Sequence, residues 1–222
     1  MNVLKSKWLL LPLLFLLFGT GDLLAQDTLR VHFLYGSRPA RGYKDVEKHL
    51  FGGIHGGHVS IGSTHGIYGF GPRDRFHLVG HRSRKRRHSY FQYETRPEFQ
   101  RDSVGKQYLT VFVPISKKTM WTIDSLHACF AQNSPYDYAF LGMRCAASSY
   151  DMLAYAGITK KRSKFGTWFR IFYPRKLRTR MVRKAESNGW KMIYRAGPER
   201  RVWERDLRRT RRRIEQNAIY QP

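Results

Sequence analysis

Alternating apolar and polar positions predict several β-strands in the first half of the chain. Residues 29–34 (LRVHFL) alternate in this way. Residues 58–62 predict a short strand, and a turn joins them to a returning strand over residues 67–70, so that the two form a β-hairpin. Residues 90–95 form a weaker candidate. Residues 107–115 (QYLTVFVPI) give the clearest signal, and we expect this strand to lie inside a sheet.

Apolar residues at helical spacing predict three helices further along the chain. Ser116 can cap a helix that carries an apolar stripe and ends near Asn133. A second helix is expected from Cys145 to Ala156, and a third over residues 174–188. Residues 190–203 are expected to fold back as a terminal hairpin. Strands that precede helices in this order are typical of an α+β protein.

The first 25 residues have the pattern of a secretory signal peptide. Lys5 and Lys7 precede an apolar run over residues 8–18, and Ala25 offers a cleavage point. The run is shorter than the ~20 apolar residues that a membrane-spanning helix needs, although an uncleaved anchor is the alternative. We therefore expect export to the periplasm or the extracellular space.

The mature chain of about 197 residues is long enough for one domain with a proper core. We expect a folded domain over residues 26–159 and a basic C-terminal extension over residues 160–222, packed on the domain or trailing from it. Residues 73–106 are polar and basic, which is typical of a functional flap or a mobile loop. A monomer is expected.

The formal net charge of +25 indicates anionic partners. Residues 160–222 alone hold 21 Lys and Arg against 5 Asp and Glu. Such a balance favours an envelope surface of anionic lipid or lipopolysaccharide, and nucleic acid is not expected because the signal peptide removes the chain from it. The runs at 84–87 and 208–213 are expected to be solvated faces.

Cys145 and His58 are the residues whose surroundings suggest nucleophilic chemistry. Cys145 opens a predicted helix, where unpaired N–H groups and the helix dipole favour a thiolate. His58 follows Gly57, and a residue without a side chain leaves room for substrate beside an imidazole. The alternative is a disulfide between Cys145 and Cys129, the two cysteines of the chain, although Cys129 is expected to be a buried apolar residue next to Phe130.

Two motifs resemble the NlpC/P60 superfamily of cysteine hydrolases. Residues 136–138 (YDY), followed by Gly142 and residues 144–148 (RCAAS), resemble the region before its nucleophile, and residues 57–61 (GHVSI) resemble its catalytic-histidine strand. Here His58 precedes Cys145 by 87 residues, which is the order of the circularly permuted branch that includes the lecithin:retinol acyltransferase-like proteins. The resemblance covers residues 29–157 and implies a papain-like fold, in which the nucleophile helix packs on an antiparallel sheet.

The resemblance implies a role for each matching residue. Cys145 would be the nucleophile and His58 the general base, acting through a thioester. A third residue that orients the imidazole is expected near residues 67–70, with His65 as the first candidate and Tyr68 as the second.

Substrate contacts are expected from Tyr136, Asp137, Tyr138 and Gly57. The two tyrosines are equally compatible with core positions, and Asp137 with a hydrogen bond that holds the loop.

No cofactor and no metal are expected. His55, His58 and His65 lie close in sequence, but glycine-rich spacing does not fix three ligands on one face. The sequence thus predicts an exported cysteine hydrolase that cleaves amide bonds of cell-wall peptides or acyl bonds of lipids, with the peptide preferred. The alternative is a non-catalytic cationic protein that binds the envelope with the same fold.

Overall fold

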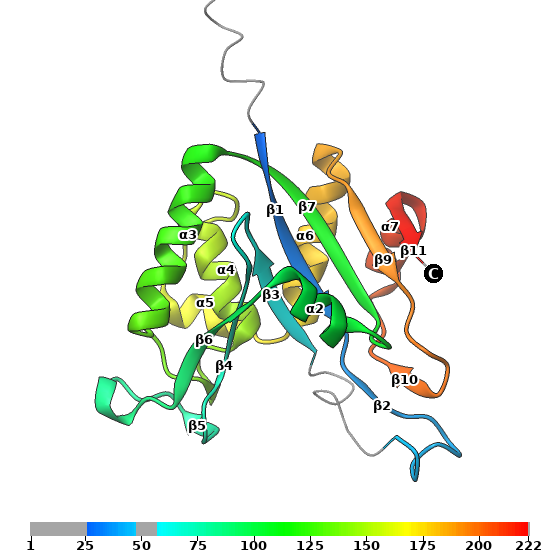
Figure 1. Ribbon diagram of the computed structural model, residues 1–222, viewed down its shortest axis with the longest axis horizontal. Coiled ribbons are helices and arrows are strands. Elements are labelled where there is room, and N and C mark those ends of the chain that lie inside the picture. The colour runs from blue at the N-terminus through cyan, green and yellow to red at the C-terminus, as the bar shows by residue number, and fades with distance from the viewer. Residues whose placement is uncertain (1–25, 48–56, 222) are drawn as a thin grey trace, which may run out of the picture.

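The computed structural model describes residues 26–47 and 57–221, so the predicted signal peptide and His55 lie outside the described residues. The centre of the fold is a seven-stranded sheet (Figure 1). In spatial order its strands are β11 (Ala218–Gln221), β9 (Met192–Arg195), β7 (Tyr108–Ser116), β1 (Gln26–Leu34), β3 (His58–Gly62), β4 (Ile67–Pro72) and β6 (Ser89–Glu94). Within this sheet only β11 and β9 pair in parallel, so the prediction of an α+β chain with a mostly antiparallel sheet is confirmed in these coarse terms.

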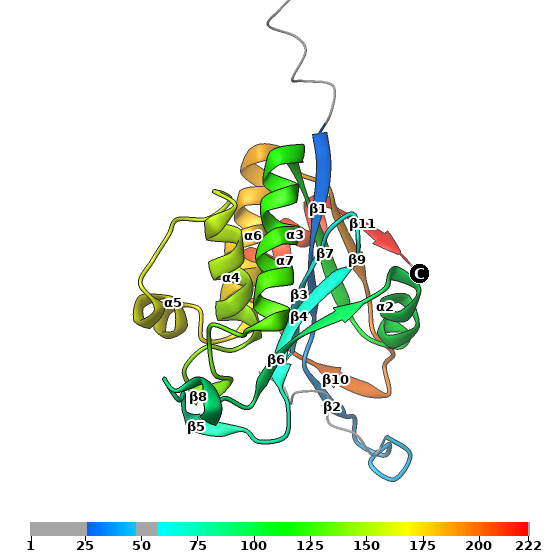
Figure 2. The same ribbon diagram turned by 60° about the vertical axis from the view of Figure 1, so that its left-hand side comes forward.

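Helices cover both faces of the sheet but very unequally. On one side lie α3 (Lys117–Gln132), α4 (Cys145–Tyr155), α6 (Pro174–Asn188) and α7 (Arg208–Asn217), with α5 (Lys164–Arg170) outside α4; α2 (Arg96–Ser103) lies on the other side (Figure 2). The strand pattern explains this division. Leu29, Val31 and Phe33 of β1 are fully buried toward the helical layer, whereas the alternating His32 and Leu34 face α2.

Local sequence signals set the bounds of several helices. The Ser116 hydroxyl accepts a hydrogen bond from the N–H of Thr119 at 3.2 Å and begins α3, as predicted. Gly189 has a φ of 65° and ends α6, as the position of this glycine predicted. Among the described residues, no helix combines the length and the apolar character that crossing a bilayer requires.

The C-terminal region, expected as an extension packed on the domain or trailing from it, adds two strands to the central sheet. β9 pairs with β7 and β11, while β10 (Arg201–Trp203) pairs with β2 (Ser37–Pro39), so the predicted terminal hairpin is wrong. Strand pairing at long range was stronger than the local turn signal. Residues 160–222 therefore complete the sheet instead of trailing from it.

The polar segment over residues 73–106 is also more structured than expected. It contains β5 (His77–Val79), a single 3₁₀ turn, β6 and α2, and a capping box between Thr95 and Glu98 begins the helix. β5 pairs in parallel with the short strand β8 (Ala139–Leu141), which lies in the segment before Cys145. We call residues 73–88 the flap.

A buried arginine joins the C-terminal region to the first strand. Arg178 of α6 is fully buried, and its guanidinium lies 3.8 Å from the centre of the Tyr35 ring. Its Nε donates to Asp206 at 2.7 Å, and Glu204 forms an ion pair with it at 3.3 Å. Tyr35 also donates to Asp206 at 2.6 Å, so one cluster connects three segments of the chain.

Replacing Arg178 should therefore destabilise the whole domain. Arg178→Ala leaves two buried carboxylates without their cation, and we expect the free energy of unfolding to fall by about 3–5 kcal/mol. Urea denaturation measures this loss. Arg183→Ala, on the exposed side of the same helix, is the matched control and should change stability by less than about 0.5 kcal/mol. Equal losses in the two variants would contradict the assignment.

Candidate active site

Cys145 is the first residue of α4 and is buried, with 3 % of its surface exposed. It is a free thiol, and Cys129 is a second free thiol on the exposed side of α3, so the structure excludes the disulfide. The expectation of a buried Cys129 is corrected as well. The stripe of α3 that faces the core consists of Met120, Ile123, His127 and Phe130, and Cys129 points away from it.

His58 meets Cys145 although 87 residues separate the two in sequence. α4 packs against β3 and β4, and the imidazole of His58, the first residue of β3, forms a hydrogen bond with the thiol. The N–H groups of Val59 and Ala146 also point to the sulfur. The sulfur thus lies where a helix N-terminus and a strand end converge.

This arrangement favours the charged forms of both groups. Burial raises the pKa of the Cys145 thiol, but the hydrogen bond and charge of His58, with the two N–H groups, outweigh it and bring the pKa below its ordinary value. Burial lowers the pKa of His58, but the Cys145 hydrogen bond and charge, with the charge of Glu94, raise it on balance. Such mutual stabilisation is what a thiolate–imidazolium pair requires.

Tyr138 is the second side chain in contact with the Cys145 sulfur. Its hydroxyl hydrogen-bonds the Cys145 side chain and accepts a hydrogen bond from the Cys145 N–H. Burial and the neighbouring thiol raise the pKa of this phenol, so it stays a neutral donor. Arg144 directly precedes Cys145 in the chain; its guanidinium stacks on Phe172 at 3.7 Å and adds positive charge beside the thiol.

A pocket of about 280 Å³ opens beside the pair. Its wall includes His58 and Tyr138, the two side chains that bond the sulfur. The remainder lies between β4, β6 and α2 and includes the charged side chains Glu94, Asp102 and Lys106. The pocket therefore offers polar and charged contacts next to the reactive group.

The expected orienting residues on the turn and on β4 lie elsewhere. His65 is in the turn beyond the far end of β3, roughly 13 Å of strand away from His58, and its imidazole pairs with Asp124 of α3 at 3.7 Å. Tyr68 donates to Asp124 at 3.1 Å and faces the core, on the side of β4 opposite to the pocket. Neither residue orients His58.

The position beside the imidazole is held by Gly69. A Cβ on Gly69 would lie 2.8 Å from Nε2 of His58, so only glycine leaves this space to the ring. Two polar side chains that line the pocket with His58 come from the next strand, where Gln92 pairs with Gly69 and donates to Glu94 at 2.5 Å. Gln92 and Glu94 were not predicted as site residues, although their alternation along residues 90–94 placed both on one face of a strand.

Three other predicted contacts turn out to be structural. Tyr136 is buried among aromatic rings, and its hydroxyl donates to Asp151. The Asp137 side chain is fully buried and accepts a hydrogen bond from His77 of the flap at 2.6 Å. Gly57 has a φ of 46°, and a Cβ there would lie 2.6 Å from the Leu34 carbonyl, so β1 fills the space that was assigned to substrate.

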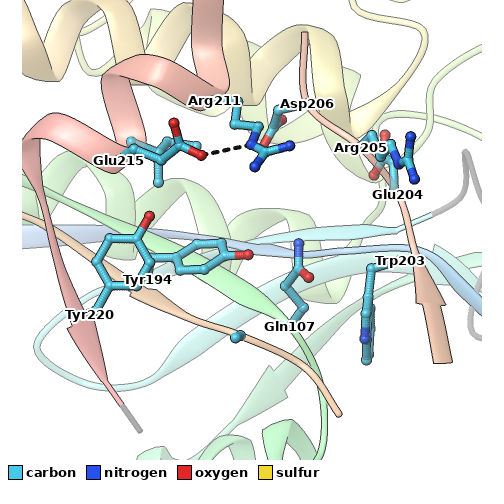
Figure 3. A pocket seen from close by; sticks show the side chains of 11 residues that line it. Gln107, Tyr194, Trp203, Glu204, Arg205, Asp206, Arg211, Glu215 and Tyr220 are labelled. Carbon is cyan, nitrogen blue, oxygen red and sulfur yellow. Dashed lines mark hydrogen bonds and ion pairs between the residues drawn. The ribbon is translucent and has the colours of Figure 1, made fainter. Parts of the chain in front are cut away.

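A second cavity of about 440 Å³ lies between β9, β11 and α7 (Figure 3). Figure 3 shows Arg211 extending toward Glu215, 2.7 Å away, with the rings of Tyr194 and Tyr220 beside them. The Asp206 carboxylate already forms an ion pair with Arg178. Among the described residues that line this cavity there is no cysteine and no histidine, so it carries none of the chemistry found at Cys145.

Gly69→Ala should disturb the Cys145–His58 pair specifically. The added methyl group displaces the imidazole, so we expect alkylation of Cys145 by iodoacetamide at pH 6.5 to slow by roughly tenfold or more, since a free thiol is about 1 % ionised there. Gly71→Ala is the control, because its Cβ meets only Tyr90 at 3.5 Å. Equal alkylation rates in the two variants would show that Gly69 has no special relation to His58.

Comparisons with known proteins identify no relative. No family model, no curated protein and no solved structure matches the chain. The geometry of Cys145, His58 and Tyr138 is therefore what indicates the chemistry of the site.

Proposed function

We propose that this chain is a cysteine hydrolase with a permuted papain-like fold. The observation that carries the proposal is the hydrogen-bonded pair of Cys145, at the start of a buried helix, and His58, on a strand far earlier in the sequence. An antiparallel sheet packed against the nucleophile helix supports the same fold. Catalysis by a thiol needs these parts in contact.

The geometry suggests a sequence of proton transfers. His58 takes the Cys145 proton, and the thiolate attacks the substrate carbonyl carbon. The carbonyl oxygen then enters between the Cys145 N–H and the Tyr138 hydroxyl and breaks the hydrogen bond between them. Both groups then donate to the developing oxyanion. His58 returns its proton to the leaving group, which departs. Water then attacks the thioester with His58 again as base, the bond between the carbonyl carbon and the Cys145 sulfur breaks, the acid product leaves, and His58 returns the proton to the sulfur. Because Tyr138 covers the sulfur in this structure, the ring must move for substrate to enter.

The pocket favours a peptide over a simple acyl chain as substrate. The carboxylates of Glu94 and Asp102 and the amine of Lys106 line it beside His58. An alkyl chain would remove water from these charged groups and offer them no polar contact, whereas a cell-wall peptide carries amino and carboxyl groups that match them. We therefore propose amide hydrolysis in such peptides, with lipid acyl bonds as the second choice.

The reaction of the two thiols tests the enzyme proposal. Alkylation is followed by peptide mass mapping, so that Cys129 serves as a reference in the same sample. We expect Cys145 to react at pH 6.5, where an ordinary thiol with a pKa of about 8.5 is only about 1 % ionised. His58→Ala removes the hydrogen bond and charge that lower the Cys145 pKa, so its rate at pH 6.5 should fall roughly tenfold or more and recover above pH 9.

Turnover is tested separately by amine release from cell-wall peptides, with Cys145→Ala as the inactive control. If Cys145 reacts no faster than Cys129 at pH 6.5 and His58→Ala changes nothing, the enzyme proposal fails. The non-catalytic binding protein would then be the better description.

We also propose that the protein binds an anionic membrane surface, with α5 as the contact. Phe165 and Phe169 are 67 % and 63 % exposed, and their rings lie parallel within 4°. Figure 2 shows α5 at the margin of the helical layer, away from the sheet.

An adjoining groove of about 730 Å³ is lined by Phe169, Arg170, Arg175, Lys176, Thr179, Arg180, Arg183 and Leu207. Exposed aromatic rings beside a groove without a carboxylate fit a lipid surface of negative charge. Export to the envelope, argued from residues 1–25, agrees with this partner.

Vesicle binding tests the α5 surface. The chain should sediment with vesicles that contain phosphatidylglycerol but not with pure phosphatidylcholine. The double variant Phe165→Ser/Phe169→Ser should bind roughly tenfold to a hundredfold more weakly, because two aromatic rings no longer enter the interface. Trp121→Ser is the control, since Trp121 is 71 % exposed on α3. An equal loss in the control would place the contact elsewhere.

A further inference from the structure

Three potential metal ligands meet where the flap lies against the segment before Cys145. They are His77 of β5, His81 after it, and Asp137, and their ligand atoms all lie within 4.8 Å of one another. Nδ1 of His77 is 2.6 Å from Oδ2 of Asp137. The ring of His81 stands perpendicular to that of His77, with 4.6 Å between their centres.

The backbone holds these side chains in place before any ligand arrives. The Asp137 carboxylate is fully buried, and the N–H groups of His81 and His88 donate to it at 2.9 and 3.0 Å. The pairing of β5 with β8, in which His77 is opposite Ala139, fixes the two segments relative to each other. A carboxylate already oriented by outer hydrogen bonds is a common property of metal sites.

A fourth group lies at the edge of the cluster. The His88 ring is 5.2 Å from that of His77, so three of the nine histidines of the chain gather in the flap. His81 is exposed, which leaves the cluster open to an ion from solvent. Imidazole nitrogens with one carboxylate are ligands that Zn²⁺ binds in tetrahedral sites.

We propose that His77, His81 and Asp137 bind a divalent transition-metal ion, best matched by Zn²⁺, with His88 or a water molecule as the fourth ligand. Zinc bonds of 2.0–2.2 Å separate tetrahedral neighbours by about 3.3 Å. The ion therefore replaces the proton between His77 and Asp137 and moves these two atoms apart by roughly 0.7 Å, which small side-chain rotations allow.

Such an ion would attach the flap to the segment that carries Tyr138. Asp137 directly precedes Tyr138, whose hydroxyl contacts Cys145. Metal binding would then stabilise the wall of the active site without touching the reacting atoms. This consequence depends on the proposed function, whereas metal binding itself does not.

Titration of the metal-free chain with Zn²⁺ tests the proposal. The titration is done in Cys145→Ala, because a thiolate–imidazole pair is itself a zinc ligand set. We expect one Zn²⁺ per chain with a dissociation constant below about 1 µM, together with a rise in the melting temperature. Co²⁺ should give the intense visible absorption of tetrahedral coordination.

Two variants decide the outcome. His81→Ala removes an exposed ligand and should weaken binding by roughly a hundredfold or more, with circular dichroism to establish that it is folded. His65→Ala, which removes an exposed histidine outside the cluster, should bind as tightly as the parent. Absence of binding in the parent, or equal affinity in His81→Ala and His65→Ala, overturns the proposal and leaves a hydrogen-bonded anchor. Alkylation of Cys145 is measured in the wild-type chain and is independent of this result. Failure of the metal site and failure of the enzyme proposal are therefore distinguishable.

Discussion

The contact between the Cys145 sulfur and the His58 imidazole is the constraint on which the arrangement of the candidate active site depends. It requires the start of α4 to reach the start of β3, which the packing of α4 on β3 and β4 provides. Two glycines make the approach possible. Gly57 lets the chain pass close to the Leu34 carbonyl, and Gly69 leaves the space that the imidazole fills. A side chain at either position would move His58, and the thiol would lose the group that lowers its pKa.

The C-terminal region supports this contact from the opposite edge of the sheet. β9 and β11 extend the sheet beyond β7, and α6 covers the helical face next to α4. Arg178 fixes α6 to Tyr35, which follows β1, and β1 is the neighbour of the strand that carries His58. Leaving a buried cation without its carboxylates costs several kcal/mol. The last third of the chain must therefore stay packed on the domain for the cluster to remain intact. Within that highly basic region, Arg178 thus has a structural role inside the protein.

The sequence predicted elements whose signals are local and failed where partners are distant. Ser116 at the start of α3 and Gly189 after α6 are read directly from residue type. The pairing of β10 with β2 joins residues that lie more than 160 positions apart, and no turn residue signals it. α2 was missed because its one buried apolar side chain, Phe99, gives no periodic stripe, although the Thr95–Glu98 capping box was present. At the site, Cys145 and His58 were accessible through their motifs, whereas Glu94 acts from two strands away and needs the register of β6 to be found.

The segment before Cys145 shows why residue type alone could not separate structural from chemical positions. Three consecutive side chains enter three different environments: Tyr136 the aromatic core, Asp137 the flap and Tyr138 the nucleophile. The chain bends at Tyr136 before β8 begins at Ala139, so these neighbours point to different sides. Because backbone torsions are shared, a shift of Asp137 toward or away from the flap also turns Tyr138. The hydrogen bonds that the flap donates to Asp137 therefore help to determine where the Tyr138 hydroxyl lies, and Phe76 of the flap also packs against the Tyr138 ring, with 5.8 Å between the ring centres.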